Sequence, residues 1–319
     1  METRLLGTTD LQVSRLGLGT VELGMPYGLG LPEPPDDDTC IRFLHQAYDA
    51  GITFVDTAAA YGRSEELIGR AFGGNSKRPV IATKVALRPA GSEARLHGTA
   101  LKEHVEGSVR RSLARLQIPV LDLLQVHSAD ERFVDAEFLE LAEDLTGRGL
   151  VRYWGASTYG ETAPLEVLDW PVVFRSLQVA YNLLDRRLDA QVLPRCRQQG
   201  VGVLFRSVLL QGVLSDRWQT LPPRLAPLQE AARLAAALAA QAGLTLAELA
   251  VRFTLHHPVA DTVLFGSSRF DELQANLAAV DAGPLPANLM AAVATIQVND
   301  PLLLHPGNWH LQSSAIPRG

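Results

Sequence analysis

The chain has 319 residues, of which 47% are apolar and 20% charged, and its formal net charge is −6. This is the composition of an ordinary globular protein, and its acidic balance argues against nucleic acid or an anionic membrane surface as a main partner. Its two cysteines, Cys40 and Cys196, lack metal-ligand spacing and indicate reduced thiols. With no long apolar run at its N-terminus, the sequence predicts a cytoplasmic protein without a membrane segment.

Short apolar strands alternate with amphipathic helical patterns along the chain, after a predicted β-hairpin over residues 4–14. The predicted strands lie at residues 16–20, 52–55, 79–84, 121–127, 151–158, 176–181, 201–207 and 262–267. Eight strand–helix alternations predict an α/β fold of the (β/α)₈ TIM barrel type, formed as one domain over residues 1–319. We expect the hairpin at its start and a C-terminal loop over its active-site face.

A doubly wound dinucleotide-binding sheet is the alternative architecture. It requires a G-x-G-x-x-G pattern that opens the first helix. Here Gly17 and Gly19 are followed by Glu22 at the last glycine position, and a Gly- and Pro-rich loop over 21–35 comes next. The pattern therefore favours the barrel.

Four polar side chains of different type lie at or just after the ends of three consecutive strands. Asp56 and Tyr61 follow the second strand, Lys84 ends the third, and His127 ends the fourth. In a parallel barrel all these strand ends open on one face, and neighbouring strands are about 4.8 Å apart. We therefore expect the four side chains to converge in one pocket, and no metal site is predicted there.

This set of residues suits proton transfer to or from an alcohol oxygen. A free tyrosine has a pKa near 10, and a lysine ammonium within about 4–6 Å favours its phenolate. Asp56 would keep Lys84 charged and oriented, while His127 and Tyr61 would bind a carbonyl oxygen. Such a site predicts carbonyl reduction or alcohol oxidation, with the hydride supplied by a cofactor.

The order and spacing of motifs over nearly the whole chain resemble those of the aldo-keto reductases. The matching motifs are Gly51-x-x-x-x-Asp56-Thr57-Ala58, Tyr61-Gly62, Lys84, His127, Gly155-x-Ser157, Gln178-x-x-Tyr181-Asn182, Ser207-x-Leu209-x-Gln211-Gly212, and Gly266-x-Ser268 with Asn276. The resemblance implies a barrel without a dinucleotide-binding fold and a catalytic tetrad of Asp56, Tyr61, Lys84 and His127. It also implies a nicotinamide dinucleotide that lies extended across the barrel mouth.

Carried over residue by residue, the resemblance also implies a set of cofactor contacts. They are Gly19 and Thr20 near the nicotinamide ribose, Asp56, Ser157, Thr158, Gln178 and Arg206 near the nicotinamide, Ser207, Leu209, Gln211 and Gly212 around the pyrophosphate, and Gly266, Ser267, Ser268, Arg269, Glu272 and Asn276 at the adenosine end. Two positions depart from the family pattern. Thr158 replaces the usual Asn, and Arg206 replaces an aromatic residue that stacks on the nicotinamide. The guanidinium plane of Arg206 can stack as well, or it can turn towards pyrophosphate or substrate.

The cofactor implied by the resemblance is NADP(H) or NAD(H). Glu272 stands where NADP-using members often carry Arg or Gln, and a carboxylate there repels a 2′-phosphate and can accept a hydrogen bond from a ribose hydroxyl. Arg269 could reverse this by binding the phosphate. On the basis of Glu272, the sequence slightly favours NAD(H) over NADP(H).

The loops predict the substrate less sharply than the strand ends predict the chemistry. Candidate contacts are Tyr27, Phe133, Trp218, and Trp309 with its neighbours Asn308 and His310. Aromatic, amide and imidazole groups suit a small polar or sugar-like carbonyl compound. The alternatives are a sugar or alcohol dehydrogenase that works in the oxidative direction, and a cofactor-sensing regulatory subunit with little turnover; the sequence leaves the oligomeric state open.

Overall fold

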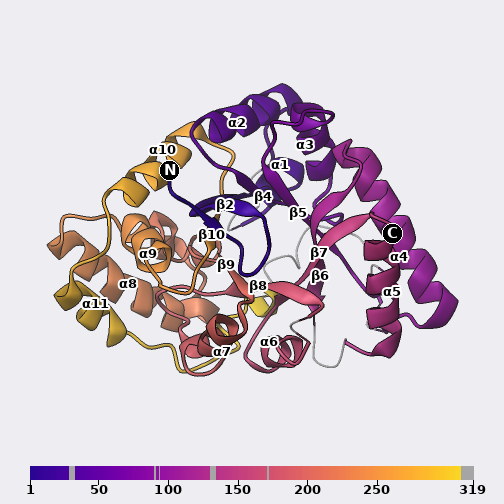
Figure 1. The fold of residues 1–319 in the computed structure, drawn as a ribbon. Coiled ribbons are helices and arrows are strands. Elements are labelled where there is room, and N and C mark those ends of the chain that lie inside the picture. Colours follow the sequence, from indigo (N-terminus) through magenta and orange to yellow (C-terminus); the bar gives the residue numbers. More distant parts are fainter. Residues whose placement is uncertain (29–32, 90, 93, 130–133, 171, 310–319) are drawn as a thin grey trace.

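The computed structural model describes residues 1–28, 33–89, 91–92, 94–129, 134–170 and 172–309. Within these ranges eight parallel strands close into a barrel in the order β10-β3-β4-β5-β6-β7-β8-β9 (Figure 1). The barrel strands are β3 (Leu16–Gly19), β4 (Phe54–Asp56), β5 (Val80–Val85), β6 (Leu121–Ala129), β7 (Val151–Thr158), β8 (Phe174–Ala180), β9 (Gly202–Arg206) and β10 (Thr262–Gly266). The predicted (β/α)₈ barrel is confirmed, and the doubly wound alternative is excluded.

Helices surround the barrel, as Figure 1 shows. They are α1 (Val21–Gly24), α2 (Asp37–Asp49), α3 (Ser64–Phe72), α4 (Gly98–Leu116), α5 (Ala136–Gly147), α6 (Thr162–Val167), α7 (Val192–Gln199), α8 (Ala226–Gln241), α9 (Leu246–Leu255), α10 (Phe270–Asp281) and α11 (Ala287–Ala294). The 3₁₀ helices are η1 (Arg187–Asp189), η2 (Leu210–Gly212), η3 (Asp216–Thr220), η4 (Pro223–Leu225) and η5 (Pro306–Trp309). The segment predicted as a loop over 21–35 contains α1, which is a correction to the prediction.

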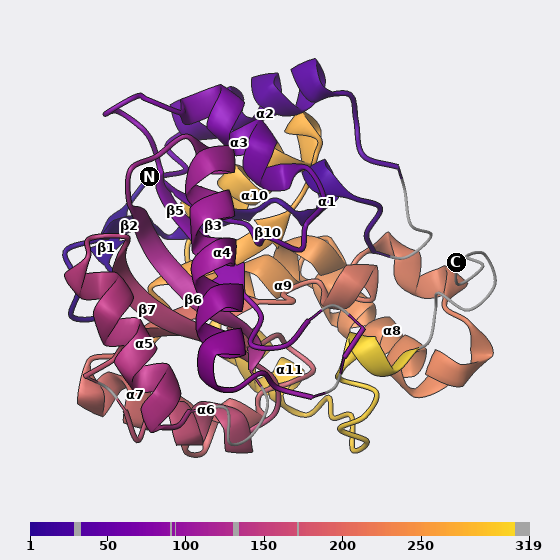
Figure 2. The same cartoon turned by 90° about the vertical axis from the view of Figure 1, so that its right-hand side faces the viewer.

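A two-stranded hairpin of β1 (Thr3–Leu5) and β2 (Gln12–Ser14) closes one end of the barrel. Leu6, Leu11 and Val13 from this hairpin region are buried against barrel-interior side chains such as Phe54 and Leu123. Figure 2 shows the hairpin at one end of the molecule and α1 towards the other. Because the hairpin fills the amino-terminal end of the strands, only the carboxyl-terminal end is left for a site.

The C-terminal segment lies on that opposite end. The imidazole of His305 stacks on Tyr159, the residue that follows β7, with ring centroids 3.8 Å apart. Trp309 is buried, and its indole Nε1 donates a hydrogen bond to the carbonyl of Leu303 at 2.8 Å. Among the described residues no single helix is long and apolar enough to cross a membrane, although the bent pair Pro223–Gln241 and Leu246–Leu255 together satisfies length and composition.

Candidate active site

The four side chains predicted from the strand ends meet at the carboxyl-terminal end of β4, β5 and β6. The Nζ atom of Lys84 lies 2.6 Å from Oδ2 of Asp56 and 3.4 Å from the phenol oxygen of Tyr61. The ring of His127 packs edge-on against that of Tyr61, with centroids 5.7 Å apart. The convergence expected from the strand register therefore occurs.

The carboxylate of Asp56 accepts hydrogen bonds from two side-chain amides in addition to the ammonium of Lys84. Its Oδ1 atom accepts hydrogen bonds from the side-chain amides of Gln125 at 3.1 Å and Gln178 at 2.7 Å. Gln125 was missed by sequence reasoning. It lies on β6 directly beside Lys84 on β5, so the alternation of side chains along the strand was the signal that could have found it. Both oxygens of the buried carboxylate are thus satisfied, and Asp56 cannot rotate away from Lys84 without losing these bonds.

Lys84 is buried yet charged. Burial alone lowers the pKa of an ammonium group, but the charges of Asp56 and Tyr61 and the hydrogen bonds to them outweigh burial and raise the pKa of Lys84. The Nζ atom also donates to the carbonyl oxygen of Thr57 at 2.8 Å. The result is a fixed positive charge immediately beneath the phenol oxygen of Tyr61.

The surroundings of His127 disfavour its charged form, whereas those of Lys84 favour the charged form. Burial, together with the positive charges of Lys84 and Arg206, lowers the pKa of His127 to about 3. The imidazole is therefore neutral at physiological pH, and a neutral ring can donate one N–H hydrogen bond to an oxygen without supplying a mobile proton.

A single cleft of about 750 Å³ runs from these side chains across the barrel mouth to α10. Predicted site residues that line it are Gly19, Thr20, Tyr27, Asp56, Tyr61, His127, Ser157, Gln178, Arg206, Ser207, Leu209, Gln211, Gly212, Gly266, Ser268, Arg269, Glu272 and Asn276. Within it the phenol oxygen of Tyr27 accepts a hydrogen bond from Gln211 at 3.4 Å. Most of the predicted residues are thus brought to one continuous surface.

Some predicted residues lie outside the lining. Lys84 lies beneath it, Thr158 is fully buried at the end of β7, and Ser267 is buried with its hydroxyl donating to Glu272 at 2.7 Å. Trp218 packs on the hydrophobic core and Trp309 is enclosed by the C-terminal segment, so neither of these candidate substrate residues reaches the cleft. Phe133 and His310 lie outside the described residues, and Asn308 lies in a smaller hollow beside Tyr159.

The loop after β9 has an unusual backbone. Ser207, Leu210 and Gln211 all have left-handed φ angles, of 59°, 45° and 53°, and Gly212 has a φ of 101°. Non-glycine residues adopt this conformation at a cost of about 1–3 kcal/mol each, and such residues cluster at ligand sites. The N–H groups of Leu210 and Gly212 donate within this turn, to the carbonyl oxygens of Ser207 and Leu209. The turn lines the cleft where the phosphate contacts are predicted.

Arg206 lines the cleft, and its guanidinium lies on the ring of Tyr159. Its Cζ atom is 3.9 Å from the Tyr159 ring centroid, and Nη2 donates to the carbonyl oxygen of Thr158 at 2.8 Å. Tyr159 lines the cleft and was missed by sequence reasoning, although it directly follows the end of β7. The replacement of an aromatic residue by Arg206 thus comes with a nearby ring that holds the guanidinium.

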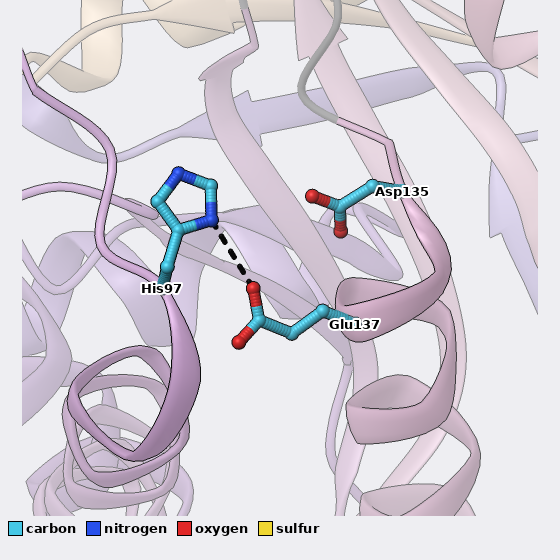
Figure 3. A group of neighbouring side chains, drawn as sticks. All are labelled: His97, Asp135 and Glu137. Atoms are coloured by element: carbon cyan, nitrogen blue, oxygen red, sulfur yellow. Dashed lines mark hydrogen bonds and ion pairs between the residues drawn. The ribbon is translucent and has the colours of Figure 1, made fainter.

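His97, Asp135 and Glu137 form a group whose ligand atoms lie within 4.8 Å of one another (Figure 3). The group joins the starts of α4 and α5: His97 Nδ1 is 3.2 Å from Glu137, and Asp135 caps α5 by accepting from Phe138 N. Both oxygens of Asp135 already accept hydrogen bonds from the guanidinium of Arg95, at 2.7 and 2.8 Å. This cation would repel a metal ion, so we assign the group a structural role.

The comparison with known proteins agrees with this geometry. The model of the aldo/keto reductase family matches residues 15–297. The chain belongs to the aldo/keto reductase family. The aldo-keto reductase YhdN of Bacillus subtilis is 30% identical over 296 residues, which cover 86% of this chain and 87% of that protein. The NADH-specific methylglyoxal reductase of Escherichia coli is 32% identical over 227 residues, which cover 66% and 68% of the two chains.

Among solved structures, the aldo-keto reductase AKR11C1 from Bacillus halodurans, in its holo form, is similar in fold. It superposes with a TM-score of 0.76 at 30% identity and covers 93% of this chain and 96% of its own. This aldo-keto reductase is therefore an oxidoreductase of a family that uses NAD(P)H and acts on small carbonyl substrates.

The residues present fit a nicotinamide dinucleotide. The cleft is long and continuous, with amide and hydroxyl groups at the Tyr61 end and the left-handed turn at its middle. At its far end Asn276 supplies an amide. The cofactor contacts inferred from the sequence stay predictions.

Proposed function

We propose that this aldo-keto reductase reduces a small polar aldehyde or ketone, with hydride from NADH and the proton from Tyr61. The observation that carries the proposal is the geometry of three groups: a buried ammonium 3.4 Å from the Tyr61 phenol oxygen, fixed by Asp56 at 2.6 Å. A phenol in this position is poised to exchange a proton with a bound oxygen.

Each side chain has a distinct part in the proposed reaction. The Tyr61 hydroxyl and the neutral His127 imidazole donate hydrogen bonds to the substrate carbonyl oxygen and orient it. As negative charge develops on that oxygen, the Tyr61 proton moves to it, and the Lys84 charge stabilises the phenolate that remains. Asp56 keeps Lys84 charged and in place. The bound nicotinamide supplies the hydride, and Ser157 and Gln178 would hold its carboxamide.

The proposed preference for NADH over NADPH is based on the charged residues at the adenosine end of the cleft. Glu272 occupies the position at which a cationic or amide side chain would bind a 2′-phosphate. Arg269, which could have reversed this preference, is paired with Asp271, to which its Nε donates at 3.0 Å. It also lies 3.8 Å from Glu272. Arg269 thus has two carboxylate neighbours, Asp271 and Glu272, at this end of the cleft.

The substrate end of the cleft favours a polar compound. His127, Tyr27, Tyr159 and Arg206 all line the cleft, and their imidazole, phenol and guanidinium groups can donate hydrogen bonds. A small oxo compound that carries hydroxyl or carboxylate groups would find donors there. That one relative is a methylglyoxal reductase is consistent with a small polar carbonyl substrate. We further propose that residues 1–319 act as one domain.

The test is a panel of aldehydes, ketones and sugars assayed with NADH and NADPH in parallel, with the corresponding alcohols and oxidised cofactors as a second panel. We expect turnover in the reductive panel, fastest with NADH and small polar carbonyls. Turnover confined to the alcohol panel would instead support the oxidative dehydrogenase. Tight cofactor binding without turnover in either panel would support the cofactor-sensing subunit.

A further inference from the structure

Glu22 is a second carboxylate at the adenosine end of the cleft, and sequence reasoning gave it no role. It belongs to α1, the short helix that follows β3. Because Gly19 on β3 pairs in register with Gly266 on β10, α1 is brought beside the turn that begins at Gly266. A Cβ atom on Gly266 would lie only 2.9 Å from Oε1 of Glu22. The carboxylate therefore lies in the space above Gly266, where a side chain would otherwise be.

This carboxylate has no hydrogen-bond donor among the described residues, although it lines the cleft and is half-buried. The charged groups that act on it are Glu272 across the cleft and Arg217 from η3. Burial and the like charge of Glu272 raise the pKa of Glu22 to about 6, against the opposing effect of Arg217. On the neighbouring α3 side, Arg63 is 3.0 Å from Asp37, and so its charge is engaged elsewhere.

Two acceptors that face one cleft, with one of them unpartnered, call for a ligand that donates hydrogen bonds and carries no negative charge there. A ribose with free 2′- and 3′-hydroxyl groups has this chemistry, whereas a ribose 2′-phosphate has the reverse. We propose that Glu22, together with Glu272, recognises the unphosphorylated adenosine ribose and excludes its 2′-phosphate. Glu22 is thereby a specificity-determining residue of the cofactor site. This inference rests on the proposed function, because it requires the dinucleotide to occupy the cleft.

The test uses ADP-ribose and 2′-phospho-ADP-ribose, which contain the adenosine end but no nicotinamide, so that binding can be measured without catalysis. Titration calorimetry on wild type is expected to show tighter binding of ADP-ribose. In Glu22→Gln the preference should shrink about tenfold, because one negative charge near the phosphate is removed. ADP-ribose affinity itself should change less than about fivefold, since the amide oxygen still accepts a hydrogen bond.

Two further variants control this experiment. Glu103→Gln removes the same charge from an exposed position on α4, across the barrel from α10 in Figure 1, and should leave the preference unchanged. Glu22→Asp keeps the charge and should retain most of the preference. Lowering the pH from 7 to 5 should weaken the preference more in wild type than in Glu22→Gln, because Glu22 takes up a proton in this range. The phosphate protonates in both proteins, so the difference between them isolates Glu22.

The outcomes separate the inference from the proposed function. If neither ligand binds wild type, the cleft is not a dinucleotide site and the proposed function fails with it. If both bind and Glu22→Gln keeps the wild-type preference, the inference alone is overturned, and Glu272 or Arg217 determines the selectivity.

Discussion

The carboxylate of Asp56 accepts hydrogen bonds from side chains of three different strands: Lys84 on β5, Gln125 on β6 and Gln178 on β8. These hydrogen bonds hold the carboxylate of Asp56 in place. Asp56 in turn holds the ammonium of Lys84 at 3.4 Å from the phenol oxygen of Tyr61. In a low-dielectric interior, groups that are already oriented stabilise developing charge without reorganisation. We infer that Asp56, Gln125 and Gln178 position Lys84 for the proposed proton transfer without contacting the substrate.

The depressed pKa of His127 makes a prediction about acid stability. Burial, Lys84 and Arg206 hold the native pKa at about 3, whereas an unfolded histidine has a pKa near 6.5. Between these values the unfolded state binds a proton that the native state does not, so stability falls as pH falls. At pH 5 the loss from this group is about 2 kcal/mol relative to pH 7.

Urea unfolding at pH 7 and pH 5 checks this expectation. His127→Asn should lose about 2 kcal/mol less than wild type between the two pH values. His45→Asn changes an exposed histidine on α2 and should retain the wild-type loss. Equal acid sensitivity in all three proteins would show that His127 does not oppose protonation in the native state.

The sequence predicted the four polar residues at the strand ends and missed Gln125, Tyr159 and Glu22. Asp56, Tyr61, Lys84 and His127 are identifiable because charge and phenol groups are rare at strand ends. Gln125 has only the weaker signal of strand alternation, and Tyr159 only its place after a strand. The groups that these residues and Glu22 contact depend on how neighbouring strands and loops pack, which one sequence does not specify.

Among the elements, α1 and the loop that carries Tyr61 are joined by a contact that only glycine permits. A Cβ atom on Gly24 would lie 1.9 Å from the carbonyl oxygen of Tyr61, and one on Gly62 would lie 2.3 Å from the carbonyl oxygen of Gly24. Backbone atoms on both sides leave no flexible group to move aside. We infer that this contact fixes the position of the Tyr61 loop relative to Lys84.

Gly24→Ala should displace this loop. We expect destabilisation of about 1–3 kcal/mol, as for other overpacked sites, and a fall in kcat of about a hundredfold from misplacement of Tyr61 by about 1 Å. Gly147→Ala is the matched control, because no atom lies within 4 Å of a Cβ there, and it should keep wild-type kcat. Full activity in folded Gly24→Ala would mean that the loop finds its position by other contacts.

The elements themselves were predicted closely where their patterns are strong. The strand at Val151–Thr158 has the expected bounds, and the strand expected over 262–267 ends one residue earlier, at Gly266. The four-residue helix α1 was not predicted, because one turn offers no apolar period to detect. It is fixed instead by packing against the Tyr61 loop.

In the whole molecule, the residues that stabilise the hairpin end of the barrel and the residues that line the cleft lie at opposite ends of the strands. The hairpin and its apolar cluster fill one end, and the cleft lies at the other, so that the two ends can vary separately. The alternation of strands and helices was sufficient to predict this arrangement. The course of the cleft towards α10, and the two carboxylates at its end, follow from closure of β10 onto β3 and required the structure.

The central claim is that Tyr61 transfers the proton to a carbonyl oxygen. It is tested most directly by comparing Tyr61→Phe with wild type, measuring turnover of a responsive carbonyl substrate and, in parallel, NADH binding by fluorescence. We expect kcat to fall by about a hundredfold or more, as for loss of a general acid, with the NADH dissociation constant within a few-fold of wild type. Undiminished turnover in Tyr61→Phe would contradict the account.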